Sequence, residues 1–483
     1  MAKKFYITTP VYYVNSEPHA GSAYTTIAAD ILARWHKLLG DDVFFLTGTD
    51  EHGQKVQEAA EKAGLTPKEF CDKISIKFKR AWQALNIEYD NFIRTTDPKH
   101  EAEVKKILQD LYDKELIYKG NYEACYCVGC EQYLTLSDLV NGKCPVHGKE
   151  PEIRKEEAYL FKLSSFQDKI LELIESGKFS ILPEARRKEV VTFVKTGLQD
   201  ISISRLKEKV PWGIELPFDS NHTCFVWVDA FWSYLTGLKE ENSFDKYWPP
   251  ALQLMAKDIL RVHSTIWPAL LLATGNKLPK SLFVHGYFTI DGKKMSKSLG
   301  NVISPVALAE KYGTDSVRYF LMRHIPFGQD GDFSETALVE RHNNELANNL
   351  GNLVSRVTTL AEKYSTEKCK NKLLDKLKFE EIEKLVENYE LDKALGLIFE
   401  FVNVCNEYIQ HEKPWEESCS SRGKILYELI NSIKAISFLL WPFMPETCEK
   451  IAKNLGYKIK SLKDFSKPIE GKFKKSEILF NKI

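Results

Sequence analysis

The chain lacks several features that mark membrane, secreted and strongly basic proteins. Its 483 residues contain no apolar run long enough to span a bilayer, and the N-terminus lacks the apolar core of a signal peptide. Lysine plus arginine (67) balances aspartate plus glutamate (67), so contacts with nucleic acid would have to come from local patches. Internal repeats and low-complexity segments are missing as well. These absences predict a cytoplasmic globular protein that does not associate with membranes.

Length and composition predict a multidomain protein. A chain of this length is typical of about three domains. The contents of 43% hydrophobic and 28% charged residues are ordinary for globular proteins. Beyond residue 333 the pattern changes to long helices, which predicts an all-helical C-terminal region.

The N-terminal residues have the pattern of a nucleotide-binding β-α-β unit. Residues 5–8 form a short apolar run, residues 27–39 are apolar at helical spacing up to Gly40, and residues 43–47 form a continuous apolar run. A continuous run is typical of a parallel strand covered on both faces. The first turn has neither a Gly-x-Gly-x-x-Gly sequence nor a Walker lysine, which argues against a dinucleotide dehydrogenase or a P-loop enzyme.

That turn carries His19, Ala20, Gly21 and Ser22 at the predicted start of the helix. Free amides and the helix dipole favour phosphate in such a place. Gly21 would let a nucleotide approach the backbone, and His19 can donate a hydrogen bond to an α-phosphate. A lone histidine before a helix is more often a cap, so both interpretations stay open at this point.

A lysine-rich loop follows a predicted strand at residues 281–285. Lys293, Lys294 and Lys297 crowd into five positions beside Ser296 and Ser298. Ammonium groups held there would neutralise the charge that develops as pyrophosphate leaves a triphosphate, which lowers the reaction barrier. A merely solvated loop is the alternative.

Four of the ten cysteines lie between residues 125 and 144. Cys127-x2-Cys130 and Cys144-x2-His147 form two chelating pairs, and thiolates with one imidazole are the donor set of a tetrahedral Zn²⁺ site. Four protein ligands leave no open position. The sequence therefore predicts a structural zinc ion.

The helical region has one apolar stripe, made of Leu346, Leu350, Leu353, Val354 and Val357. Asn352 and Arg356 are four residues apart and share another face. By sequence alone, a solvated helix face is the simpler explanation of these two polar residues.

Several segments resemble one known family. Lys294-Met295-Ser296-Lys297-Ser298 is identical to the second signature of the class I aminoacyl-tRNA synthetases, and residues 19–22 resemble their first signature, His-Ile-Gly-His, with Ser22 in place of the second histidine. Residues 9–15, 47–53, 225–230 and 257–268 are similar to the methionyl-tRNA synthetases. The resemblance covers nearly the whole chain.

The resemblance implies an α/β fold in which a Rossmann-like parallel sheet is split by a zinc-binding insertion and followed by an all-α anticodon-binding bundle. The resemblance implies a catalytic domain at residues 1–118 and 222–290, an insertion at 119–221, a lysine loop and stem-contact region at 291–345, and an anticodon-binding domain at 346–483. The insertion looks too small for a separate editing domain. Because no additional RNA-binding domain follows, a monomer is expected.

The resemblance also implies a reaction and its residues. The chain would join L-methionine to tRNA(Met), initiator and elongator, through a methionyl-adenylate made from ATP with Mg²⁺. Catalysis would fall to His19, Lys294 and Lys297, and ATP binding to these three with Gly21 and Ser22. The implied methionine pocket comprises Val11, Tyr13, Asp50, Trp227, Ala230, Tyr234 and His285, with Asp50 on the α-ammonium. The anticodon would be read by Asn352 and Arg356 and stacked on Trp415.

Two other interpretations stay open. The chain could be a class I synthetase for another apolar amino acid, or a catalytically weak, zinc-containing RNA-binding paralogue, which Ser22 suggests. Plain core packing is also an alternative for Trp227 and Tyr234. Methionine-dependent pyrophosphate exchange separates the functional alternatives.

Overall fold

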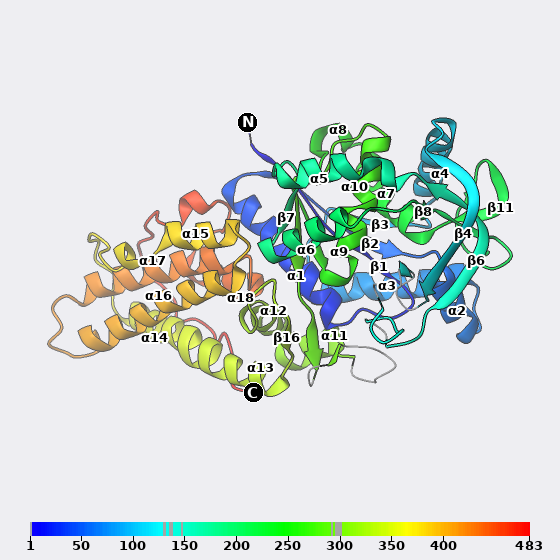
Figure 1. Ribbon diagram of the computed structural model, residues 1–483. Helices are drawn as coiled ribbons and strands as arrows, with labels where there is room; N and C mark the ends of the chain where they lie inside the picture. Colours follow the sequence, from blue (N-terminus) through cyan, green and yellow to red (C-terminus); the bar gives the residue numbers. More distant parts are fainter. Residues whose placement is uncertain (1, 129–131, 135–138, 146–147, 291–292, 295–301) are drawn as a thin grey trace.

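The computed structural model describes residues 2–128, 132–134, 139–145, 148–290, 293–294 and 302–483 (Figure 1). An α/β body, blue to green in Figure 1, lies beside a helical body, yellow to red. None of the helices in this part of the chain combines the length and apolar character needed to cross a bilayer.

A parallel six-stranded sheet forms the centre of the α/β body, in the order β3-β2-β1-β12-β13-β7. The strands are β1 (Lys4–Tyr13), β2 (Asp42–Asp50), β3 (Asn91–Arg94), β7 (Ser180–Leu182), β12 (Leu252–Ala256) and β13 (Ser281–His285). Successive residues of β2 point to opposite faces of the sheet and are buried in different cores, with Phe45 in one and Leu46 in the other. Both faces of the strand are therefore covered, as its continuous apolar sequence predicts.

The strand order reverses at β1. The chain passes from β1 to β2 and β3 on one side, and returns to β12 on the other side only after a long insertion. The connections diverge at the carboxyl end of β1, which is where open α/β sheets bind ligands. This edge is therefore the expected place of the active site.

Helix α1 (Ala20–Leu39) covers one face of the sheet together with α12 (Thr314–Arg323). Its apolar residues, including Ile27, Ile31 and Trp35, are buried. The helix ends at Gly40, which has φ 88° and donates its N–H to the His36 and Lys37 carbonyls. Both the helix and its end are as predicted, because a glycine accepts this left-handed conformation without strain.

The opposite face is covered by α7 (Val226–Glu240) and α10 (Ile266–Ala273). Helix α4 (Pro98–Asp113) packs against α7. Strand β12 runs to Ala256, and two short helices, α9 (Leu260–Ser264) and α10, follow it and are separated at Thr265.

The insertion forms an antiparallel sheet in the order β5-β4-β6-β8. Its strands are β4 (Ile117–Cys127), β5 (Gln132–Leu134), β6 (Glu152–Phe161) and β8 (Ile201–Ser202). Two findings differ from the sequence analysis. Strand β7 leaves the insertion to extend the parallel sheet beside β13, and β11 (Asp219–Cys224) belongs to a separate sheet with β9 (Ser204–Leu206) and β10 (Glu215–Leu216). In chain order the parallel sheet therefore resumes at β7, within the implied insertion, and continues at β12, whereas His222 lies in β11 outside this sheet.

The C-terminal region is helical, as predicted. Its elements are α13 (Glu335–Arg341), a π-helix (His342–Gly351), α14 (Asn352–Lys363), α15 (Phe379–Glu387), α16 (Leu391–Glu412), α17 (Arg422–Leu440) and α18 (Pro445–Leu455). The predicted apolar stripe, Leu346 to Val357, is buried against the other helices.

Arg318 of α12 joins the two bodies. Its guanidinium is fully buried and donates to the Asp30 carboxylate of α1 at 2.6 Å. It also donates to the carbonyls of Pro442 and Phe443, just after α17, at 2.8 and 3.0 Å. A buried guanidinium needs such acceptors, so this contact fixes α1 relative to the helical body.

Candidate functional site

His19 caps the N-terminus of α1 at the switch point, the place beside the carboxyl end of β1 where the strand order reverses. Its Nδ1 accepts the Gly21 N–H at 3.0 Å. A Cβ at position 21 would lie 2.9 Å from His19 Cε1, so a side chain there would displace the imidazole. The structure thus gives Gly21 a role in seating His19, and the cap and phosphate-donor interpretations of His19 are compatible through different ring nitrogens.

Ser22 closes the same turn. Its hydroxyl accepts the His19 N–H at 3.0 Å and donates to the His19 carbonyl at 2.8 Å. A serine three residues after the cap therefore performs the reciprocal half of a capping box. This contact gives the departure from the family signature a local structural reason.

The end of the lysine-rich loop returns to this turn. The first amide of α1, at Ala20, donates to the carbonyl of Ile303 at 3.0 Å. At its other end, Lys294 belongs to β15 (Lys293–Lys294), which pairs with β14 (Phe288–Ile290) directly after β13. Lys297 lies outside the described residues, between these two anchored ends.

Val11, Tyr13 and Asp50 meet at the carboxyl ends of β1 and β2. Val11 is in register with Gly48, and Tyr13 with Asp50. The Val14 N–H donates to the Asp50 carbonyl at 3.2 Å. Asp50 is buried at the very end of its strand, where its carboxylate can meet a ligand in the crevice.

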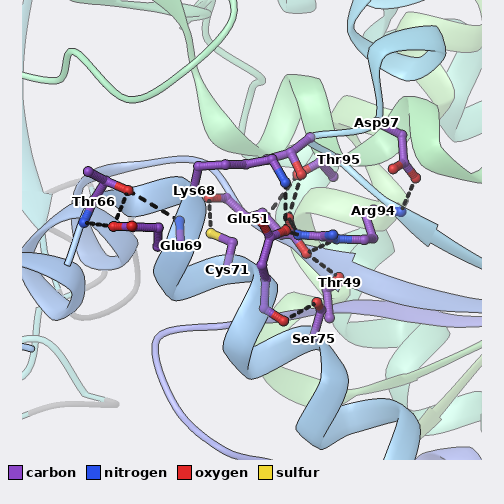
Figure 2. Close-up of polar contacts among 12 residues, drawn as sticks. Thr49, Glu51, Thr66, Lys68, Glu69, Cys71, Ser75, Arg94, Thr95 and Asp97 are labelled. Carbon is purple, nitrogen blue, oxygen red and sulfur yellow. Dashed lines mark hydrogen bonds and ion pairs between the residues drawn. The ribbon is translucent and has the colours of Figure 1, made fainter.

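Glu51 anchors this strand end (Figure 2). Its carboxylate accepts both Nε and Nη2 of Arg94 at 2.8 Å. It also accepts the Thr49 and Thr96 hydroxyls at 2.7 and 2.5 Å. Burial alone would lower the pKa of Arg94, but the carboxylates of Glu51 and Asp72 outweigh burial and raise it. A bidentate, buried pair of this kind leaves the backbone beside Asp50 little freedom.

Helix α7 supplies the aromatic wall of the site. Trp227, Ala230 and Tyr234 follow at helical spacing and are buried. The Trp227 ring lies edge-on to the Tyr13 ring, with 6.1 Å between centroids. The predicted residues of β1 and α7 are thus brought together across the switch point.

His263 of α9, which the sequence analysis gave no role, belongs to this wall. Its Nδ1 donates to the Ile259 carbonyl at 2.9 Å, so its Nε2 accepts the Tyr234 hydroxyl at 2.8 Å. Burial lowers the pKa of His263 to about 4, which keeps the imidazole neutral. The only hint in the sequence that His263 belongs to this wall is its position four residues, about one helical turn, before Trp267.

His285 lies at the α1 side of the same edge. Its Nδ1 donates to the Gly286 carbonyl at 2.7 Å, and its Nε2 accepts the Thr25 hydroxyl at 2.7 Å. Burial lowers the pKa of His285 to about 4. The residue therefore ties β13 to the helix that begins at His19.

The predicted zinc ligands are described only in part, because Cys130 and His147 lie outside the described residues. Cys127 ends β4, and both Cys127 and Cys144 are buried. The Cys144 N–H donates to the Lys149 carbonyl, and its carbonyl accepts the Gly148 N–H, both at 2.8 Å, so the chain turns back around Cys144. Within the described part of the chain, no group of three or more His, Cys, Asp or Glu could hold a metal. Buried thiols at a strand end and at a tight turn are of the type that structural zinc sites use as ligands.

A second candidate site lies on the helical body. Trp415 is 39% exposed, and the Arg356 guanidinium carbon lies 5.4 Å from the centroid of its ring. Arg356 Nη2 donates to Gln410 Oε1 at 3.1 Å, and Asn352 donates to the Asn348 carbonyl at 2.8 Å. The predicted anticodon residues are therefore on one accessible face.

An open cavity of about 470 Å³ lies on α16 beside these residues, lined by Asn406, Glu407, Gln410 and His411. Asn406 donates to the Asn349 side-chain oxygen at 2.7 Å, which joins α16 to the π-helix. Amides, a guanidinium and an exposed indole are the groups that bind unpaired bases. The α16 residues were not predicted, because their spacing alone matches a solvated helix face.

Comparison with known proteins gives consistent matches along the chain. The family described as tRNA synthetases class I (M) matches residues 5–149 and 135–358, and the anticodon-binding domain of tRNA ligase matches residues 373–481. The chain is 45% identical to the methionine--tRNA ligase of Caldanaerobacter subterraneus subsp. tengcongensis, over 100% of this chain and 79% of that protein. It is 42% identical to that of a Nostoc species, over 95% and 91%.

A solved structure has the same fold. Mycobacterium tuberculosis methionyl-tRNA synthetase in complex with methionyl-adenylate superimposes with a TM-score of 0.93 at 37% identity, over 99% of both chains. The match extends through the sheet and the helical body. The chain therefore belongs to the methionyl-tRNA synthetase family of class I aminoacyl-tRNA synthetases.

Proposed function

We propose that this chain joins L-methionine to tRNA(Met), both initiator and elongator, in two steps. In the first, a methionine carboxylate oxygen attacks the α-phosphorus of ATP, the bond from that phosphorus to the bridging oxygen breaks, and pyrophosphate leaves. In the second, a terminal ribose hydroxyl attacks the carbonyl carbon, loses its proton, and AMP leaves.

The observation that carries this proposal is the hydrogen bond between Ala20 N–H and the Ile303 carbonyl. It holds the exit of the lysine-rich loop against the turn that bears His19. Lys297, six residues earlier, would then reach the same triphosphate as His19. Opposed imidazole and ammonium donors around an α-phosphate stabilise the charge of the transition state.

The amino acid would lie between the strand ends and α7. Asp50 would accept the α-ammonium group, a charge-assisted contact. Val11, Tyr13, Trp227, Ala230 and Tyr234 would surround the thioether, with His285 at the α1 side. A rigid aromatic wall suits a flexible, polarisable thioether.

The helical body would bind the anticodon. Trp415 would stack on one base, and Arg356 and Asn352 would bond base edges. The cavity on α16 offers room for a base beside them.

Two metal ions complete the proposal. Zn²⁺ would be held by Cys127, Cys130, Cys144 and His147 and would stabilise the insertion. Mg²⁺ would enter with ATP and neutralise phosphate charge. We also propose that the enzyme is a cytoplasmic monomer.

Pyrophosphate exchange with each apolar amino acid tests the function. Methionine should support exchange, and Lys297→Ala should slow it by roughly 10²- to 10³-fold while methionine binding stays nearly intact. Lys277→Ala, an exposed lysine before β13, is the matched control and should behave as the unmodified enzyme. Exchange driven by another amino acid would overturn the proposal. Equal losses of binding and exchange would show that the loop only supports the fold.

A further inference from the structure

A buried polar cluster lies behind the aromatic wall of the methionine pocket. Three elements contribute to it: the connection after β2 supplies His52, α4 supplies His100 and Glu101, and α7 supplies Asp229. The side chains of His52, His100 and Asp229 are 4%, 0% and 1% exposed. The proposed reaction assigns no role to these groups.

Both oxygens of the Asp229 carboxylate are occupied. Oδ2 accepts His52 Nδ1 at 2.6 Å, and Oδ1 accepts His100 Nε2 at 2.7 Å. His52 Nε2 lies 3.5 Å from Glu101 Oε1. Two directional bonds from opposite imidazoles fix the position and the orientation of the carboxylate.

The electrostatics strengthen the arrangement. Burial alone would lower the pKa of His52, but Asp229 and Glu101 outweigh burial and raise it to about 10. Burial alone would raise the pKa of Asp229, but His52 and His100 outweigh burial and lower it. At neutral pH the bond is therefore an imidazolium–carboxylate pair inside the protein, where a missing partner is costly.

The cluster also touches a second point on α7. His100 Nδ1 lies 2.7 Å from the Thr236 hydroxyl, two helical turns after Asp229. At about 100° per residue, Asp229 and Thr236 lie on one side of α7, and Trp227, Ala230 and Tyr234 lie on another. Apolar contacts alone are not directional, so they would leave the rotation of the helix poorly defined.

We propose that Asp229, held by His52 and His100, is a positioning residue that sets the rotation of α7 and thereby the wall that recognises methionine. His52 follows Asp50 by two residues, so the same contact also sets the distance between the wall and the ammonium site. This inference rests on the proposed function.

The test measures KM for methionine and for ATP in pyrophosphate exchange, with thermal melting as a check on folding. Asp229→Asn and His100→Ala should raise KM for methionine by roughly 10- to 100-fold and change KM for ATP less than about twofold. His100→Gln keeps a donor and should recover most of the loss. A further readout is the selectivity for methionine over norleucine, which should fall in the same two variants.

The exposed ion pair between Lys239 of α7 and Glu103 of α4, at 2.5 Å, provides a matched control because it joins the same helices at the surface. Lys239→Met should leave both KM values unchanged. The inference is overturned if KM for methionine and ATP rise together, if only the melting temperature falls, or if Lys239→Met has the effect of Asp229→Asn. If the unmodified enzyme shows no methionine-dependent exchange, the proposed function fails, and this inference fails with it.

Discussion

The proposed methionine pocket and the proposed anticodon face hold their polar groups in opposite ways. Tyr234 in the pocket wall and Asp229 behind it are buried, and each bonds to a histidine that is itself held by another protein group. On the proposed anticodon face, Trp415 is 39% exposed, and the Arg356 guanidinium donates to the side chain of Gln410. The amino acid would therefore bind to side chains that the protein already holds in place. An RNA base would bind to side chains that are partly exposed and would itself help to order them.

The difference has an energetic consequence. A buried polar group that loses its partner costs about 1–3 kcal/mol, so changes in the pocket should affect folding and binding together. An exposed ring or guanidinium keeps its water when its partner is removed. Changes on the anticodon face should therefore affect only binding.

Asp50→Asn would test the pocket side most severely. It removes the carboxylate proposed to bind the α-ammonium, and losing one partner of a buried ion pair costs about 3–5 kcal/mol. The kcat/KM for methionine in pyrophosphate exchange should fall by roughly 10²- to 10³-fold. Asp42→Asn, at the half-buried start of the same strand, should leave it unchanged. A kcat/KM within a few-fold of the unmodified enzyme would remove Asp50 from the ammonium site.

Trp415→Ala would test the other side. Stacking of a base on an aromatic ring is worth about 1–3 kcal/mol, so tRNA charging should weaken by roughly 5- to 150-fold. Pyrophosphate exchange and the melting temperature should not change. Trp415→Phe keeps a ring and should retain most of the charging activity. Unchanged charging by the alanine variant would end the anticodon assignment.

Arg356→Lys should have a smaller effect on the same face. Lysine keeps the charge but lacks the planar fork, so KM for tRNA should rise about fivefold. A double-mutant cycle with Gln410→Ala should show coupling, because Gln410 accepts from Arg356. Strictly additive losses would mean that Gln410 does not orient the guanidinium.

The last expected effect is a pH dependence of stability in the pocket, which is measured as a slope against pH. The pKa of His52 is raised to about 10 in the folded chain and is about 6.5 when unfolded. The folded state therefore binds more protons between these values, and the stabilisation is full below about pH 6.5 and is lost as the pH rises through about 10. Unfolding by denaturant should show a decline of at most about 1.4 kcal/mol per pH unit that is missing in His52→Gln. Parallel curves for the two proteins would contradict the charge assignment.

Individual helices and strands could be predicted from the sequence, but the pairing of strands that are distant in the chain could not. The helix from the His19 turn to Gly40, the strand that ends at His285 and the helical C-terminal region follow from periodicity and caps. Strand β7 was missed because three residues, Ser180–Leu182, carry no signal of which sheet they will join. Pairing with β13 is decided by contacts distant in sequence.

The site divides in the same way. His19, Asp50 and Trp227 were named from motifs, and the structure brings their elements to one edge of the sheet. His263 could not be named, because a lone histidine among apolar residues gains its meaning only when α9 packs beside α7 and its ring meets Tyr234. The cluster around Asp229 likewise needs three separate elements.

The buried guanidinium of Arg318 links the position of the α/β body to that of the helical body. One side chain grips Asp30, on the helix that starts at His19, and the carbonyls of Pro442 and Phe443. Rotation of either body about Arg318 would leave its guanidinium buried without hydrogen-bond acceptors. Any hinge motion between the two bodies would therefore have to break these buried bonds, so the Arg318 contact opposes a change in their relative position.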